Sequence, residues 1–214
     1  MNVVNYQKEL EKILNKIEGN PPTLFLHSCC APCSSYVLKY LRKYFRITVF
    51  YYNPNISEQE EYKKREEEQK KLIEIYNSQL EEEGYLISVI EGDYEPERFY
   101  EFARPLKDCP EGGERCFLCY EQRLRKTAEE AKRLGFDYFA TTLTISPLKN
   151  AAKLNEIGFA LEKEHGIKWL PSDFKKKEGY KQSTLLSAEY GLYRQDFCGC
   201  VYSKIERDKQ KQLD

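Results

Sequence analysis

The reactive side chains of this 214-residue sequence are concentrated in its eight cysteines. Seven of them form three short groups, which are Cys29-Cys30-x-x-Cys33, Cys116-x-x-Cys119 and Cys198-x-Cys200, and Cys109 precedes the second group. The groups are far apart in the sequence, so they meet only if the fold brings them together. A single cysteine is usually a small buried hydrophobe, whereas three tight groups indicate metal binding or redox chemistry.

Four thiolates satisfy either of two metal centres. They can close a tetrahedral zinc site, and they can equally bind a 4Fe-4S cluster. When four of the grouped cysteines bind the metal centre, three remain. Beside an iron–sulfur cluster, these three thiols can take part in electron transfer. The adjacent Cys29 and Cys30 can bind different irons of one cluster more easily than they can bind the same small ion. We therefore expect an iron–sulfur centre, with zinc as the alternative.

Two of the groups also have spacings that suit thiol–disulfide chemistry. A disulfide between Cys198 and Cys200 would close a small, strained ring, which is easily reduced and suits a redox-active pair. The same two thiols could instead bind a second metal, or form an idle turn. Cys30-Ala31-Pro32-Cys33 is similar to the thioredoxin motif, which lies at a helix start where the helix dipole lowers the thiol pKa. A disulfide exchanger needs neither Cys29 nor the two other groups.

Hydrophobic periodicity predicts alternating strands and helices. The expected strands are 23–28, 47–52, 85–90, 137–142 and 167–170. The expected helices are an amphipathic one ended by residues 19–22, one after Cys33, a charged one from Ser57 to about Glu83, a short one after Pro96, and those at 115–134, 149–164 and 183–190. This alternation indicates an α/β protein whose parallel sheet has helices on both faces. Such sheets bind ligands beyond the carboxyl ends of their strands, and the first cysteine group follows the first strand directly.

The long charged helix carries two local predictions, and the chain end a third. Ser57 and Glu60 fit a capping box. The charge run 58–71 is interpreted as a solvated helix face with i,i+4 ion pairs. The residues after the Cys198–Cys200 turn are expected to form a charged tail.

Length and composition bound the class of protein. The chain has 34 Lys and Arg against 35 Asp and Glu, a net charge of −1 and a mean hydropathy of −0.72. We expect one domain with an N-terminal helix (1–20), a βαβ core (21–170) and a C-terminal extension (171–214). No apolar run approaches the roughly 18 residues of a membrane span, and the start does not fit a secretory signal, so we expect a cytoplasmic protein. In that reducing compartment cysteines favour metal or redox roles over structural disulfides.

Several longer motifs carry a family resemblance. They are His27-Ser28-Cys29-Cys30-Ala31-Pro32-Cys33-Ser34, residues 111–120 (EGGERCFLCY) with Arg123-Leu124, Thr141-Thr142-Leu143, Ser146-Pro147-x-Lys149, Asp173-Phe174-Lys175-Lys176, and Tyr193-Arg194-Gln195-x-Phe197-Cys198-Gly199-Cys200. Together they span about residues 23–203, and this region resembles the cobalamin-independent epoxyqueuosine reductases, the QueH family. The resemblance implies a nucleotide α-hydrolase-like (Rossmann-like) fold and the reduction of epoxyqueuosine to queuosine at the wobble position of a tRNA.

The resemblance also implies roles for individual cysteines. The ligands of a 4Fe-4S cluster map to Cys29, Cys30, Cys116 and Cys119. A redox-active pair maps to Cys198 and Cys200. Cys109 lies outside the motifs, and the role of Cys33 stays open.

Removal of an epoxide oxygen takes two electrons and two protons, whereas a 4Fe-4S cluster transfers one electron at a time. The second element is either the Cys198/Cys200 pair, through thiol–disulfide exchange, or a mononuclear iron. Thiols of Cys33, Cys198 or Cys200, with a carboxylate, could hold that iron, which would polarise the epoxide oxygen. Asp173 is a candidate for the carboxylate or for a proton donor. The sequence does not identify the electron donor.

A tRNA partner must bind to a local basic face, because the net charge attracts no polyanion. The cations expected to contact phosphates are Lys149, Lys175, Lys176 and Arg194. His27 is interpreted as a buried core histidine. Two other functions remain open, namely a thiol–disulfide oxidoreductase that uses Cys30 and Cys33, and a zinc-stabilised RNA-binding module without catalysis.

Overall fold

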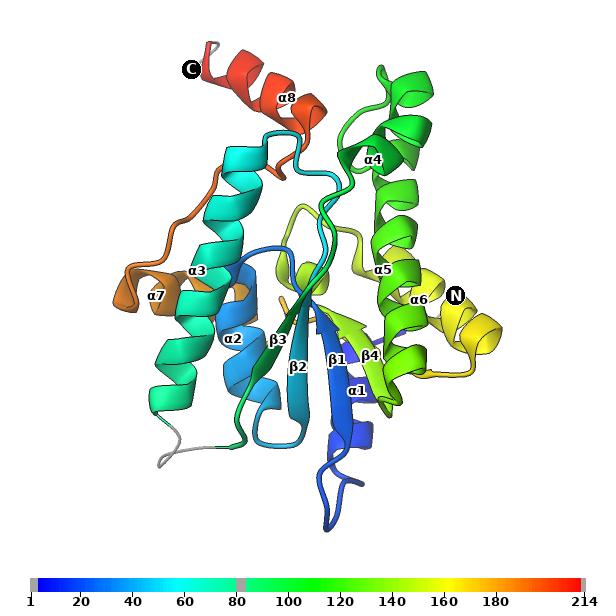
Figure 1. Cartoon of the computed structure of the whole chain (residues 1–214), viewed down its shortest axis with the longest axis vertical. Coiled ribbons are helices and arrows are strands. Elements are labelled where there is room, and N and C mark those ends of the chain that lie inside the picture. Colours follow the sequence, from blue (N-terminus) through cyan, green and yellow to red (C-terminus); the bar gives the residue numbers. More distant parts are fainter. Residues whose placement is uncertain (1–3, 80–83, 213–214) are drawn as a thin grey trace.

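A parallel β-sheet forms the centre of the molecule in the computed structural model, which describes residues 4–79 and 84–212 (Figure 1). The strands are β1 (Thr23–His27), β2 (Arg46–Tyr51), β3 (Ser88–Glu91), β4 (Tyr138–Thr141) and β5 (Lys168–Trp169). Their order across the sheet is β3-β2-β1-β4-β5, and every neighbouring pair is parallel. The predicted α/β class with a parallel sheet is confirmed.

Helices cover both faces of this sheet, as predicted. They are α1 (Tyr6–Leu14), α2 (Ala31–Leu41), α3 (Gln59–Ser78), α4 (Pro96–Ala103), α5 (Glu114–Leu134), α6 (Ala151–His165), α7 (Gly179–Glu189) and α8 (Val201–Lys211), with 3₁₀ turns η1 (Arg104–Leu106) and η2 (Thr142–Ile145). Successive side chains of a strand point to opposite faces. Leu24 and Leu26 of β1 therefore pack with α1, α2 and α3, and Phe25 packs with α5 and α6. No helix in the described residues is long and apolar enough to cross a membrane.

The pairing of β1 with β4 aligns the two loops that lead into the site. His27 lies opposite Thr141 in the sheet register, so the residues that follow each of them emerge at the same edge. At the opposite end of these strands, the carboxylate of Asp137 accepts hydrogen bonds from the backbone N and the Oγ1 of Thr23, both at 2.8 Å. Both ends of this central strand pair are thus held in register.

Several local predictions are wrong. The N-cap of α3 is Glu58, without a capping side chain, and Ser57 Oγ instead accepts a hydrogen bond from the backbone N of Val201 at 2.8 Å. The expected charged tail forms α8, in whose first turn Ser203 is buried and Tyr202 packs against Phe99. The third strand lies at 88–91 instead of 85–90, and α7 begins at Gly179 instead of Ser183. Residues 80–83, the expected end of the long helix, lie outside the described residues.

Candidate thiol-rich active site

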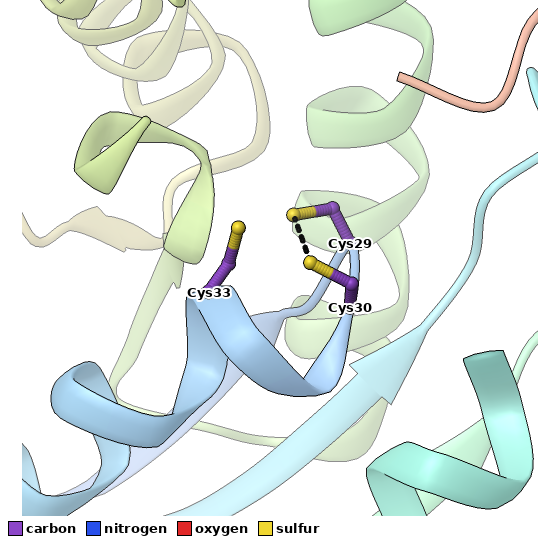
Figure 2. A group of neighbouring side chains, drawn as sticks. All are labelled: Cys29, Cys30 and Cys33. Atoms are coloured by element: carbon purple, nitrogen blue, oxygen red, sulfur yellow. Dashed lines mark hydrogen bonds between the residues drawn. The ribbon is translucent and has the colours of Figure 1, made fainter. Parts of the chain in front are cut away.

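The first cysteine group lies where β1 leads into α2. Cys30 is the N-cap residue of α2, and Pro32 lies in its first turn. The Sγ atoms of Cys29, Cys30 and Cys33 all lie within 4.8 Å of one another, and those of Cys29 and Cys30 are 3.7 Å apart (Figure 2). This group therefore lies just past the first strand, where the sequence predicted it, but the helix begins at Ala31 and includes Cys33 instead of following it.

The three thiols of this group differ in pKa, and so in how easily each becomes a thiolate. Hydrogen bonds from Cys29 and Cys33 lower the pKa of Cys30 well below its usual value. The hydrogen bond with Cys30 is the main reason that the pKa of Cys29 is raised to about 11, and the hydrogen bond with Cys29 raises the pKa of Cys33. The amino terminus of α2 also stabilises a negative charge at its N-cap. Cys30 is therefore the thiol that ionises first, which both metal binding and disulfide exchange require.

The second and third cysteine groups meet in space. Cys116 and Cys119 lie in the first turns of α5, and Cys198 and Cys200 lie in the turn before α8. All four line one small cavity of about 10 Å³. Burial raises the pKa of Cys119 to about 12. This thiol therefore needs a neighbouring cation or a metal ion in order to ionise.

A larger cavity of about 350 Å³ lies beyond the ends of β1 and β4. Its wall includes Cys29 and Cys33 from the first group and Cys198 from the third, so Cys198 lines both cavities. Four cationic side chains also line it, which are Arg65, Arg123, Lys149 and Arg194. A cavity of this size at the carboxyl ends of parallel strands is a typical ligand site.

Two of these cations are buried beside Cys198. The Arg65 guanidinium lies 2.7 Å from Glu61 Oε1 and donates to the carbonyl oxygen of Cys198 at 3.1 Å. The Lys149 ammonium lies 3.0 Å from Glu111 Oε1 and 3.3 Å from Cys198 Sγ. Both side chains thus place a buried positive charge beside Cys198.

The charge run 58–71 has the predicted i,i+4 ion pairs, Glu61 with Arg65 and Glu66 with Lys70. It is not a uniformly solvated face, however, so that part of the interpretation is wrong. Tyr62, Arg65 and Gln69 are buried, and Gln69 Oε1 accepts hydrogen bonds from Ser28 Oγ at 2.6 Å and Ser34 Oγ at 2.9 Å. Tyr62, Arg65 and Gln69 recur at helical spacing on one side of α3. That spacing was the signal by which the sequence could have revealed Arg65, which our sequence analysis missed.

The cations predicted to contact tRNA occupy different environments. Lys149 is buried, and Arg194 is exposed and lines the larger cavity. Lys175 forms an ion pair with Asp173 at 2.8 Å, and Lys176 is exposed. Asp173, Lys175 and Lys176 lie outside the walls of the two cavities.

Two further residues, His27 and Cys109, lie outside the walls of both cavities. His27 is fully buried, with Nδ1 2.9 Å from Thr141 Oγ1 and Nε2 3.0 Å from the carbonyl oxygen of Tyr52. Burial lowers the pKa of His27 to about 3, so this histidine is neutral, and its interpretation as a core residue is confirmed. Cys109 lines neither of the two cavities, and its Sγ lies 3.8 Å from the carbonyl oxygen of Pro110.

The donor set of the site fits a metal centre. All eight cysteines are free thiols, and thiolates suit zinc and iron–sulfur centres. Three buried polar atoms in the wall of the smaller cavity have no hydrogen-bond partner, namely Asn55 Oδ1, Tyr120 Oη and Arg123 Nη2. Buried polar atoms normally have partners, so these atoms indicate a polar group that binds there. The predicted ligand set takes Cys29 and Cys30 from one thiol cluster and Cys116 and Cys119 from the other, and it stays a prediction.

Clustered thiols, buried cations and a ligand-sized cavity all lie at the strand ends of a parallel sheet. This combination defines the class of thiol-dependent metal or redox proteins. Comparison with known proteins gives the family. A family model described as epoxyqueuosine reductase QueH matches residues 24–206. Proteins named epoxyqueuosine reductase QueH are similar to this chain in Streptococcus pyogenes (42% identical over 203 residues, 94% of this chain and 78% of the relative), Staphylococcus epidermidis (40% over 208 residues, 95% and 86%) and Thermotoga maritima (36% over 188 residues, 86% and 92%). The chain belongs to the epoxyqueuosine reductase QueH family, as its motifs indicated.

Proposed function

We propose that this protein reduces the epoxide of epoxyqueuosine in tRNA to the alkene of queuosine. One observation carries the proposal: thiols from all three cysteine groups line two cavities that share Cys198, in a chain of the QueH family. The larger cavity, of about 350 Å³, has room for a base that is flipped out of its stack. The reaction takes up two electrons and two protons and releases the epoxide oxygen as water.

A 4Fe-4S cluster bound by Cys29, Cys30, Cys116 and Cys119 would supply electrons one at a time. Buried cations lie near the thiols and would offset the negative charge of four thiolates. The positive charges of Arg65, Lys149 and Arg123 act on Cys30, Cys116 and Cys119 respectively, and Arg123 donates its Nε–H to the carbonyl oxygen of Cys119 at 3.1 Å. Positive charge at buried thiols lowers the cost of their ionisation.

Cys198 is the thiol placed best to meet the substrate. It lines both cavities, and Lys149 Nζ donates a hydrogen bond to its Sγ at 3.3 Å. Cys200 is buried, and its Sγ accepts a hydrogen bond from the backbone N of Ser203 at 3.4 Å. These two thiols can give up two electrons and two protons when they form a disulfide. The alternative is that Cys33, Cys198 and Cys200 hold a mononuclear iron, with Asp173 as the candidate carboxylate or proton donor.

Anaerobic purification separates this proposal from the two other functions. We expect a brown protein that contains iron and acid-labile sulfide. A colourless, metal-free protein that exchanges disulfides through Cys30 and Cys33 would favour the oxidoreductase, which the position of Cys30 at the N-cap of α2 supports. Zinc without sulfide would favour the RNA-binding module.

An activity assay completes the test. The protein is incubated with dithionite and tRNA that contains epoxyqueuosine, and the nucleoside should lose the mass of one oxygen. Cys116→Ala should remove iron and activity, whereas Cys109→Ala is the matched control, because Cys109 lines neither cavity. Cys200→Ala should keep the iron and stop turnover. A protein with a full complement of iron that leaves the nucleoside mass unchanged would refute the function.

The substrate and the reductant complete the proposal. We propose that tRNA contacts Arg194, which is exposed in the wall of the larger cavity, and also the exposed Lys176 and the partly exposed Lys175, which lie outside that wall. Electrons come from a donor that binds separately, since the reaction must be repeated on each tRNA.

A further inference from the structure

Arg123 is a buried cation whose charge has no carboxylate partner among the described residues. Its side chain is 1% exposed, its Nε donates to the carbonyl oxygen of Cys119, and its Nη2 has no hydrogen-bond partner. The other buried cations of the site differ, since Arg65 pairs with Glu61 and Lys149 pairs with Glu111. A buried charge without a counter-ion is strongly destabilising. Arg123 therefore requires an anion that is not a carboxylate.

The position of Arg123 on α5 identifies this anion. Cys116, Cys119, Tyr120 and Arg123 follow one another at i, i+3, i+4 and i+7, so they share one helix face. The hydrogen bond of Arg123 Nε to the carbonyl oxygen of Cys119 fixes the guanidinium next to that thiol's helix turn. Tyr120 Oη also lacks a hydrogen-bond partner. This helix face thus presents two thiols and two unsatisfied polar groups to the same small cavity.

Arg123 also lies between the two thiol clusters. It lines the smaller cavity with Cys119 and Cys198, and the larger cavity with Cys29 and Cys198. Burial by itself would lower the pKa of Arg123, but the charges of Cys119, Cys198 and Cys29 raise it overall. The guanidinium is too deeply buried to meet a phosphate of the substrate. Thiolates, and the metal centre they bind, are therefore the anion within its reach.

We propose that Arg123 is a positioning residue of the thiolate-bound metal centre, which donates Nη2–H to a sulfur of that centre and raises its reduction potential. The inference rests on the metal centre of the proposed function. Positive charge and hydrogen bonds to sulfur stabilise the reduced state, which carries one more negative charge. In chemical terms the centre accepts one electron from the reductant, no bond to Arg123 forms or breaks, and the guanidinium remains protonated.

The test is a redox titration of the iron-loaded protein with dithionite, without tRNA, followed by visible absorbance and electron paramagnetic resonance. Arg123→Met should lower the midpoint potential, and Arg123→Lys, which keeps the charge, should lower it less. Arg125→Met is the matched control, because Arg125 lies on the same helix and forms ion pairs with Glu121 and Glu164 at the surface. The inference would be overturned if Arg123→Met had full iron content and an unchanged potential. It would be supported if Arg123→Met lost its iron while its metal-free form folded like the wild type.

A measurement on the wild type covers the case in which the Arg123 variants do not fold. In protein labelled with ¹⁵N-arginine, the side-chain resonances of Arg123 should shift or broaden when the metal-free protein is loaded, and those of Arg125 should change less. Identical Arg123 resonances in the two forms would refute the inference. If the wild-type protein reduces epoxyqueuosine while Arg123→Met keeps its potential, only this inference fails; if the wild type binds no iron–sulfur centre, the proposed function fails with it.

Discussion

The ammonium group of Lys149 is held between a carboxylate and a thiol, away from solvent. Glu111 compensates its charge, and the remaining hydrogen bond goes to Cys198 Sγ. Burial alone would lower the pKa of Lys149, but Cys198, Tyr120 and Glu111 raise it well above its usual value. The lysine therefore stays protonated near neutral pH, and its charge acts on the thiol that lines both cavities.

From this environment we expect Lys149 to act in the reaction rather than in tRNA binding. Lys149→Met should reduce the rate of epoxyqueuosine reduction by roughly 10²-fold, because preorganised charge beside a reacting group contributes about that much. Its affinity for tRNA should stay within about twofold, since a buried ammonium cannot reach a phosphate. Single-turnover assays and filter binding measure the two quantities. Weakened tRNA binding with a normal rate would instead support the phosphate contact that the sequence predicted.

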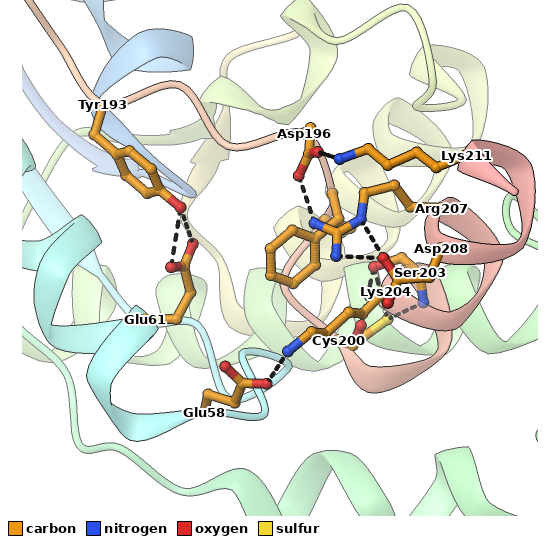
Figure 3. A network of polar contacts seen from close by, with 12 residues as sticks. Glu58, Glu61, Tyr193, Asp196, Cys200, Ser203, Lys204, Arg207, Asp208 and Lys211 are labelled. Atoms are coloured by element: carbon orange, nitrogen blue, oxygen red, sulfur yellow. Dashed lines mark hydrogen bonds and ion pairs between the residues drawn. The ribbon is translucent and has the colours of Figure 1, made fainter. Parts of the chain in front are cut away.

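The turn between Cys198 and Cys200 takes its position from the elements around it. The backbone N of Ser57 donates to the carbonyl oxygen of Gly199 at 3.1 Å, and Ser57 Oγ accepts from Val201 N. Beyond the turn, α8 is tied to the residues before α3 by an ion pair of Lys204 with Glu58, as Figure 3 shows. Contacts with Ser57 and Glu58 therefore hold this turn and the start of α8 against the residues before α3.

Gly199 is the residue of this turn that tolerates least change. Its φ is +113°, and a Cβ there would lie 2.9 Å from Ile56 Cγ1 and 3.2 Å from Arg65 Nη1. Gly199→Ala should therefore displace the turn and lower the free energy of unfolding by about 1–3 kcal/mol. It should also reduce activity under conditions in which the variant is still folded, because the two thiols move with the turn. Gly191→Ala is the control, since Gly191 also has a positive φ (+59°) but a Cβ there meets no atom within 4 Å. Urea unfolding and the oxygen-loss assay should separate the two variants, and equal effects of both would show that contacts of the turn are unimportant.

The carboxylate of Asp137 joins the amino ends of β1 and β4 through Thr23. Hydrogen bonds from the backbone N and the hydroxyl of Thr23 lower the pKa of Asp137 below 3.8. A lowered pKa gives stability above the unfolded-state value that is lost as the pH falls through the folded-state value. Asp137→Asn should thus reduce the free energy of unfolding by about 1 kcal/mol at pH 7, and this difference should shrink below about pH 3.8. Urea titrations at pH 7, 5 and 3 measure it, and a constant difference would contradict the role of the charge.

The sequence predicted the elements whose pattern is regular and missed those that depend on tertiary contacts. Apolar runs such as 47–52 have few alternatives to a buried strand, and the position of Cys30 after β1 follows from the order of elements. Two errors have the same cause. Arg65 was interpreted as solvated, and the chain after Cys200 was interpreted as a tail. In both segments most side chains are charged, so a helix face that packs on a surface distant in the sequence is not recognised from the sequence alone. The contacts of Arg65 with Cys198 and of Ser57 with Val201 exist only in the folded chain.

At the scale of the whole molecule, a net charge of −1 gives no general attraction to RNA. Many surface cations are neutralised by neighbouring carboxylates, as Lys177 is by Glu11 and Lys181 is by Glu178. Arg194 differs, because its guanidinium donates to Ser187 Oγ at 3.3 Å and has no ion pair with a carboxylate in the described part of the chain. An exposed cation of this kind at a cavity mouth can bind a phosphate without first breaking an ion pair.

Binding to tRNA should therefore depend on salt through a small number of contacts, and Arg194 should be one of them. Neutralisation of a phosphate releases counter-ions, and the logarithm of the binding constant falls with that of the salt concentration by about 0.7 per contact on a single strand. Arg194→Gln should weaken binding and reduce this slope by nearly one contact, whereas Lys181→Gln, which removes a cation already paired with Glu178, should change the slope little. Filter binding of an unmodified anticodon stem-loop from 50 to 300 mM salt gives both slopes. Within the described residues, Arg194 is the one side chain of the cavity wall that both carries an exposed positive charge and lacks a carboxylate partner. The same slope for wild type and Arg194→Gln would therefore show that the tRNA does not contact the wall of this cavity through a phosphate.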